Sequence, residues 1–122
     1  MSDQAIEQEI QAKGKIAARV TPADIETNIL AEYFINPAES YAAVNGGAKA
    51  LAHESLSLLT ICVVVLENGF TVTGESACAS PENFDAEIGR KIARQNAVQK
   101  IWPLMGYELK QRLASGPAKS VS

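Results

Sequence analysis

The sequence predicts an α+β fold with N-terminal helices, a central antiparallel β-hairpin and a C-terminal helical hairpin. A β-branched, apolar run at 58–66 and an alternating run at 70–76 are joined by Asn-Gly, which is the pattern of a β-hairpin. A serine-proline pair at Ser80 indicates the start of a helix, and Pro103 interrupts the helical pattern that follows.

Length and charge narrow the class of protein. At 122 residues the chain is expected to form a single domain, 1–122, with a core of its own. Eleven basic and fourteen acidic residues give a net charge of -3, which argues against a dedicated duplex-DNA binder. Two cysteines are too few for a disulfide framework, and no stretch reaches the roughly 20 apolar residues of a membrane span. We therefore expect a cytoplasmic protein with no membrane contact.

Two helices are expected in the N-terminal part. The first spans 2–13, with acids in its early turns and Gly14 at its end. The second begins at Thr21, an N-cap residue followed by proline. Three of its apolar residues, Ile25, Ile29 and Leu30, are expected to lie on one face. This face continues towards Tyr33 and Phe34.

Three segments are expected to be mobile. These are the two ends, 1–14 and 115–122, and a loop at 36–56. The loop is rich in Asn, Pro, Ala, Gly and Ser, with Asn-Gly-Gly at 45–47 near its middle. Such a loop can act as a lid that orders on binding.

The register of the hairpin follows from its turn. A two-residue turn at 68–69 sets Val65 opposite Val72 and Cys62 opposite Glu75. One face is then apolar near the turn, and the other face is half polar. The two cysteines do not face each other in this register, which argues against a disulfide.

The C-terminal part is expected to hold two helices. The first should run from Ser80 to about Ile101, with serine as its cap and acids in its first turn. Pro103 should break it and begin a second helix through Leu113. A ridge of small residues should let another helix approach closely, beside a larger apolar stripe. The ridge consists of Gly89, Ala93 and Ala97, and the stripe of Phe84, Ile88 and Ile92.

A lone hairpin should recruit a second copy of the chain. Two strands are marginal in water unless a helix layer covers them and their edges are paired. The first strand, 58–66, is apolar on both faces, as strands buried on two sides are. This predicts a homo-oligomer formed by sheet extension or by face packing. The alternative is a third strand from 49–57 within the same chain.

Three sequence blocks are specific enough to point to relatives: NGFTVTGESA, SPENFD and NAVQKIWPLMGY, all within Leu59–Leu113. With the upstream segment EIQAKGKIAARVTPADIETNI, they resemble a family of small phage and prophage proteins labelled gp-forty-nine-like or gene-sixty-six-like. The resemblance implies carriage on a phage genome or prophage and a place in the host cell. It brings no activity and no catalytic residues to this chain.

A basic group on the C-terminal helices is the main candidate binding surface. Such a group can receive a phosphate-bearing ligand or an acidic protein, and the aromatic residues near it can stack or anchor an interface. The alternative is a solvated helix face, with Asp85 and Glu87 pairing with the bases at helical spacing. The candidate residues are Arg90, Lys91, Arg94, Trp102, Tyr107 and Arg112.

A second candidate is an anion site at the expected helix start. Ser76, Ser80 and Asn83 lie near its backbone N–H groups, whose dipole favours negative charge. Capping explains the same residues without a ligand.

No group of residues predicts catalysis. His53 is the only histidine and has no nucleophile motif near it. Cys78 precedes the helix start, where a thiol pKa can fall, but no base is visible beside it. A packing role is the alternative for this cysteine. We expect no enzymatic activity, no metal and no cofactor.

Two functions are compatible with these features. The first is a non-enzymatic phage accessory protein that oligomerises and inhibits or sequesters a host component, such as a defence factor or a nucleotide signal. The alternative is a nucleic-acid-associated helper in phage recombination or replication, using the same basic residues on single strands. The sequence identifies neither the ligand nor the subunit number.

Overall fold

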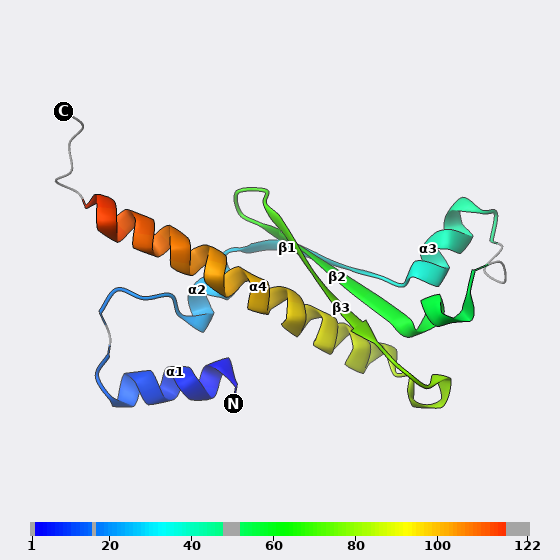
Figure 1. Cartoon of the computed structure of the whole chain (residues 1–122), viewed down its shortest axis with the longest axis horizontal. Coiled ribbons are helices and arrows are strands. Elements are labelled where there is room, and N and C mark those ends of the chain that lie inside the picture. Colours follow the sequence, from blue (N-terminus) through cyan, green and yellow to red (C-terminus); the bar gives the residue numbers. More distant parts are fainter. Residues whose placement is uncertain (1, 16, 48–51, 117–122) are drawn as a thin grey trace. The chain divides into compact units, whose positions relative to one another are not determined.

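The computed structural model describes residues 2–15, 17–47 and 52–116. The elements lie along the chain as Figure 1 shows, and they form the α+β fold that the sequence predicts. In chain order they are α1 (Asp3–Ala12), α2 (Pro22–Thr27), β1 (Ile29–Ile35), α3 (Pro37–Val44), η2 (Glu54–Leu58), β2 (Leu59–Leu66), β3 (Thr71–Ala77), η3 (Pro81–Asn83) and α4 (Ala86–Ser115), where η marks a short 3-10 helix. The described part of the chain contains no helix that is long and apolar enough to cross a membrane.

The chain separates into two compact units. The terminal unit combines 1–28 with 101–122, and the sheet unit spans 29–100. The long helix α4 belongs to both, since the division falls between Lys100 and Ile101.

The helix starts of the terminal unit are those that the sequence predicts. The Ala5 N–H donates to the Ser2 side chain at 3.1 Å, which caps α1. In α2, Thr21 and Asp24 form a capping box in which each side chain accepts from the other residue's backbone N–H. Gly14 has φ +69 just after α1. This left-handed conformation favours glycine and ends the helix there.

The second predicted helix is wrong beyond Thr27. The next residues, Ile29–Ile35, form β1, which pairs antiparallel with β2. This segment is rich in β-branched and aromatic residues, and cross-strand pairing therefore outweighs its helical spacing. β1 is thus the third strand; of the alternative segment 49–57, the described residues 52–57 contain most of η2 and no strand, and 49–51 lie outside the described residues. The sheet thus has the order β1-β2-β3 within one chain, and the premise of a lone hairpin is wrong.

The predicted mobile loop contains helical structure. Asn36 caps α3 by accepting from the backbone N–H groups of Ala38 and Glu39. Its side-chain amide also donates to the Ser57 carbonyl at 3.1 Å, which ties the start of α3 to the end of η2. The middle of the predicted loop, 48–51, lies outside the described residues, as does the tail from 117 onward.

The hairpin is present, but its turn is one residue longer than predicted. The Gly69 N–H donates to the Leu66 carbonyl, and the Leu66 N–H donates to the Phe70 carbonyl, each at 2.8 Å. The loop therefore holds three residues, 67–69. Gly69 has φ +89, the left-handed position that three-residue hairpin loops reserve for glycine.

The longer turn changes which residues of the hairpin face each other. Val64 stands opposite Val72, and Cys62 stands opposite Gly74, where Glu75 was expected. Side chains alternate along a strand, so a shift of one residue exchanges the two faces of β3. The predicted faces are therefore wrong, and Val72 of β3 shares the buried face with Cys62, Val64 and Leu66 of β2. Both cysteines are free thiols.

The helix α4 covers the buried face of the sheet, which we call the inner face. Its cap is Asp85, which accepts from the Ile88 N–H, while the predicted start at Ser80 leads only into the short η3. The predicted break at Pro103 is also wrong, because one helix runs on to Ser115. Proline lacks a backbone N–H, so the helix loses one hydrogen bond at this position. The helical turns on both sides of Pro103 remain intact. The C-terminal helical hairpin is therefore a single long helix.

The ridge of small residues on α4 packs against the sheet. The sequence had predicted that this ridge would contact another helix. Gly89, Ala93 and Ala97 are buried. A Cβ atom added to Gly74 would lie well inside 3.0 Å of the backbone of Ala93 and Ala97. The two backbones can approach this closely only because Gly74 has no side chain. The residues buried with the ridge are Thr60, Cys62, Val64, Leu66, Val72 and Val98.

The predicted apolar stripe of α4 is solvent-exposed in part. Ile88 is 55% exposed and Ile92 is 42% exposed. The helix turns its narrow ridge to the sheet, and the larger side chains beside it therefore cannot enter the same interface.

We expect Gly74→Ala to lower the free energy of unfolding by about 2–4 kcal/mol, because backbone atoms of α4 must move to admit a methyl group. Gly106→Ala is the matched control. No atom lies within 4 Å of a Cβ atom added there, and this helical position should gain about 0.5–1 kcal/mol. Chemical denaturation followed by circular dichroism measures both. A Gly74→Ala variant as stable as the wild type would contradict the close packing.

Candidate binding surfaces

The second face of the sheet, which we call the outer face, is the largest candidate surface. Paired residues of neighbouring strands share a face, so the register assigns its members. It consists of Ala31, Tyr33 and Ile35 on β1, Leu59, Ile61, Val63 and Val65 on β2, and Thr71, Thr73, Glu75 and Ala77 on β3.

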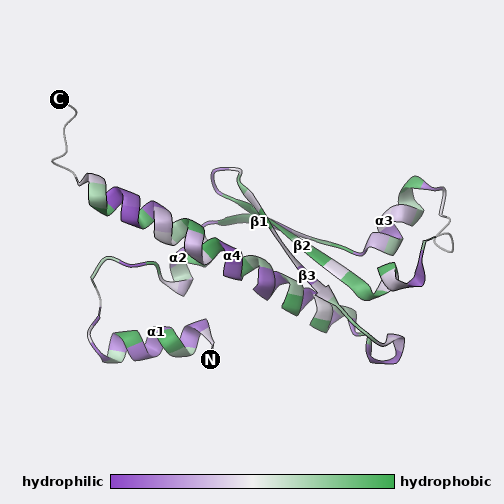
Figure 2. Cartoon of the chain, in the orientation of Figure 1, coloured by the Kyte–Doolittle hydropathy of each residue, from purple (hydrophilic) through white to green (hydrophobic). Residues whose placement is uncertain are grey.

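The outer face is apolar and open to solvent. Tyr33 is 57% exposed, and the β2 members are half-buried while their inner-face neighbours are buried. Glu75 is its one charged member. Figure 2 shows β2 as hydrophobic along most of its length, which reflects apolar residues on both faces. A strand of this kind is typical of a sheet that is covered on two sides.

Both edges of the sheet carry features that oppose pairing with another strand. β1 has a bulge at Leu30, which disrupts the ladder locally. On β3, the Asn96 side-chain amide donates to the Glu75 carbonyl at 2.8 Å. Hydrogen-bonded pairs alternate along antiparallel strands, and Leu66 bonds to Phe70. The Glu75 carbonyl therefore points to the open edge, and α4 occupies part of that edge.

The predicted basic group is largely matched by acids. Arg94 bonds to Glu32 of β1 at 2.7 Å, with both side chains about one-third exposed. Lys91 lies 3.3 Å from Glu87, one turn away on the exposed side of α4. Arg90 is exposed. The solvated helix face considered as the alternative describes this arrangement better than a concentrated anion-binding patch.

The two aromatic candidates differ in exposure. Trp102 is half-buried, and its indole N–H donates to Asp3 of α1 at 3.0 Å. Tyr107 is 73% exposed. Arg112 bonds to Glu108 one turn away at 2.5 Å. Trp102 thus contributes a contact within the terminal unit, and Tyr107 is the member of the pair that a ligand can reach.

The candidate anion site already faces a carboxylate of the chain. The Ser80 hydroxyl donates to Glu82 at 2.5 Å, and this bond lowers the pKa of the Glu82 carboxyl. Ser76 stands opposite Thr60 on the inner face, and Asn83 is exposed. An incoming anion would meet the negative charge of Glu82 beside Ser80.

The histidine and the two cysteines have structural surroundings. His53 accepts from the Ser55 N–H and caps η2. Burial, and then the charge of Glu32, raise the pKa of the Cys62 thiol. Cys78 is half-buried, and its thiol donates to the Ser80 carbonyl at 3.2 Å. Burial thus disfavours the thiolate form of Cys62, and the Cys78 thiol makes its hydrogen bond within the chain.

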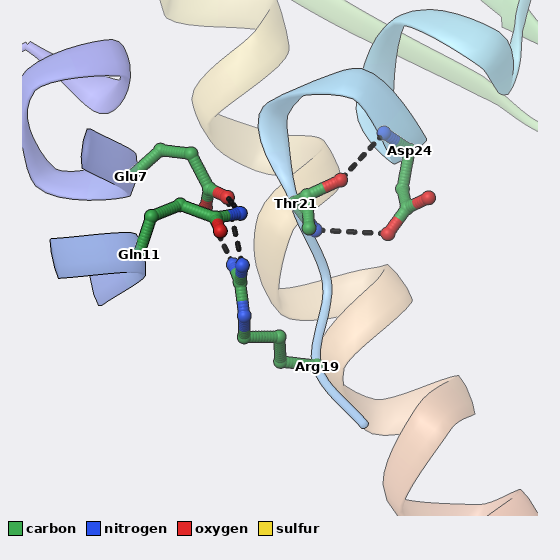
Figure 3. Close-up of polar contacts among 5 residues, drawn as sticks. All are labelled: Glu7, Gln11, Arg19, Thr21 and Asp24. Carbon is green, nitrogen blue, oxygen red and sulfur yellow. Dashed lines mark hydrogen bonds and ion pairs between the residues drawn. The ribbon is translucent and has the colours of Figure 1, made fainter. Parts of the chain in front are cut away.

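A polar cluster that the sequence analysis did not identify joins α1 to the segment before α2. The two terminal guanidinium nitrogens of Arg19, Nη1 and Nη2, donate to the two carboxylate oxygens of Glu7 at 2.5 and 2.8 Å. Gln11 donates to the same carboxylate at 2.8 Å, as Figure 3 shows. Bidentate pairs of this kind are the strong ones. Nothing in the spacing of Glu7 and Arg19 signals the pair, because a loop separates them.

The fold and its surfaces define a class: a small α+β protein whose sheet has one face packed under a long helix and one apolar face open. A sequence profile of the Phage protein (N4 Gp49/phage Sf6 gene 66) family matches residues 20–113, which is most of the chain. The chain belongs to this family of phage proteins, as its sequence blocks predict. The match includes the whole sheet and most of α4. No curated protein and no solved structure matches the chain.

The Glu7 cluster predicts an acid-dependent contribution to stability. Its hydrogen bonds to Arg19 and Gln11 lower the pKa of Glu7 from 4.5 to about 2. A carboxyl with a lowered pKa stabilises the folded state fully above pH 4.5, and this contribution is lost as the pH falls towards 2. An NMR titration of the Glu7 side chain should show the low pKa, and Arg19→Gln should raise it. A wild-type pKa near 4.5 would contradict the bidentate pair.

Proposed function

We propose that this phage protein acts without catalysis, by associating with itself and by binding a host component that it inhibits or sequesters. The open, apolar outer face of the sheet carries this proposal. Monomeric proteins rarely expose a contiguous apolar patch, and such a patch usually marks a surface that another molecule covers. The outer face offers eight apolar side chains around one charge.

Charge favours a protein over a nucleotide as the host component. The acids beside Arg94, Lys91 and Arg112 reduce the positive potential that α4 presents to a phosphate. A defence protein with an apolar or mixed surface does not need that potential. The same charge pattern weighs against the nucleic-acid helper, whose affinity would depend on phosphate contacts.

Sedimentation velocity over a range of concentrations tests the self-association. The weight-average mass should rise from the subunit mass of 13.0 kDa towards a multiple of it. High salt should leave this rise intact or strengthen it, because the proposed contact is apolar. A mass that stays at the subunit value at every concentration would refute the proposal.

A binding titration with a fluorescent single-stranded oligonucleotide distinguishes the proposed function from the alternative, a nucleic-acid-associated helper. We expect no binding at low salt. The double variant Arg90→Ala with Lys100→Ala is the matched comparison. Both residues are exposed, and their substitution leaves the Arg94–Glu32 ion pair in place. Steeply salt-dependent binding that this variant abolishes would instead support the nucleic-acid helper.

A further inference from the structure

We propose that a second copy of this chain packs on the outer face, so that the two sheets form a two-fold symmetric β-sandwich. The α4 helix of each copy then lies on the side of its sheet that faces away from the other copy. This inference rests on the proposed self-association and names its geometry. The central row of the interface would be Tyr33, Val63 and Thr73, which lie side by side across the three strands.

The edges of the sheet direct a second copy to the face. Sheet extension through β1 would meet the bulge at Leu30, and extension through β3 would displace the bond from Asn96 to the Glu75 carbonyl. Neither obstacle touches the outer face. Of the two modes of association that the sequence allowed, face packing therefore needs the smaller rearrangement.

Side-chain size makes the outer face complementary to itself. A two-fold axis parallel to the strands sets β1 of one copy over β3 of the other and β2 over β2. In the central row, the large Tyr33 then faces the small Thr73, and Val63 faces Val63. Large over small is the arrangement by which facing layers interdigitate. The tyrosine hydroxyl also gains a partner of suitable chemistry in the threonine hydroxyl.

Charge supports a second copy over a strongly charged partner. Glu75 is the one charged residue among the eleven of the outer face, and it lies on the edge strand β3. A basic protein or a phosphate backbone would therefore find little complementary charge at the centre of this face. Two copies bury their apolar centres together and keep both Glu75 carboxylates near the rim.

The area of the outer face fits a weak, reversible dimer. Strands of seven or eight residues make a face of roughly 25 by 14 Å, from a rise of ~3.4 Å and a strand spacing of ~4.8 Å. Two such faces amount to about 700 Å² in total, at the small end of the size range, where weak and transient interfaces lie. We therefore expect a dimer whose population depends on concentration.

Charged substitutions at the centre of the face test the geometry. Val63→Lys and Val63→Glu should each abolish dimer formation, because like charges would meet across the two-fold axis. An equal mixture of the two variants should restore a dimer, because Lys and Glu would then face each other. Val44→Lys, at an 82% exposed position of α3, is the matched control and should dimerise as the wild type does.

The outcomes separate this inference from the proposed function. Dimers of Val63→Lys as stable as those of the wild type, or a mixture that stays monomeric, would overturn the sandwich and leave self-association standing. A wild type that never dimerises would overturn both. Circular dichroism establishes that each variant folds. If Val63→Lys does not fold, Tyr33→Ser replaces it, since this exposed ring should weaken dimerisation about tenfold or more.

Discussion

Close contact between the α4 backbone and Gly74 of β3 is the constraint on which the sheet unit depends. It requires a glycine in the strand and small residues, Ala93 and Ala97, on the helix. With the helix so close, the inner-face side chains of β2 are buried completely although the sheet has only three strands. The contact also fixes the position of Asn96, whose amide reaches the open edge of β3.

Covering one face so tightly leaves the other face open. The apolar residues of β2 alternate between the two faces, and one helix can cover only one of them. The remaining apolar area is too contiguous to be explained by scattered surface residues. Our proposal of self-association therefore rests on this uncovered face, and no longer on the unpaired hairpin edges that the sequence suggested. The outer face is therefore a better candidate site than the basic residues of α4, because acidic side chains lie beside Lys91 and Arg94.

Sequence reasoning succeeded where the signal is local. The first helix and its end at Gly14, the cap at Thr21, the hairpin and the family resemblance each depend on residues a few positions apart. It failed at Ile29–Ile35, which has apolar residues at helical spacing but pairs with β2, a strand distant in the sequence. It also failed at Pro103, where the local cost of proline is smaller than the stability of a thirty-residue helix.

Residue order was enough to establish the α+β class, the positions of two helix starts, the existence of the hairpin and membership of a phage family. It was not enough for the register or for the choice of faces. Whether the turn holds two or three residues changes local geometry little, yet it exchanges every side chain of β3 between core and solvent. That choice depends on the burial of Val72 and the fit of Gly74 under α4, which are long-range contacts that arise on folding.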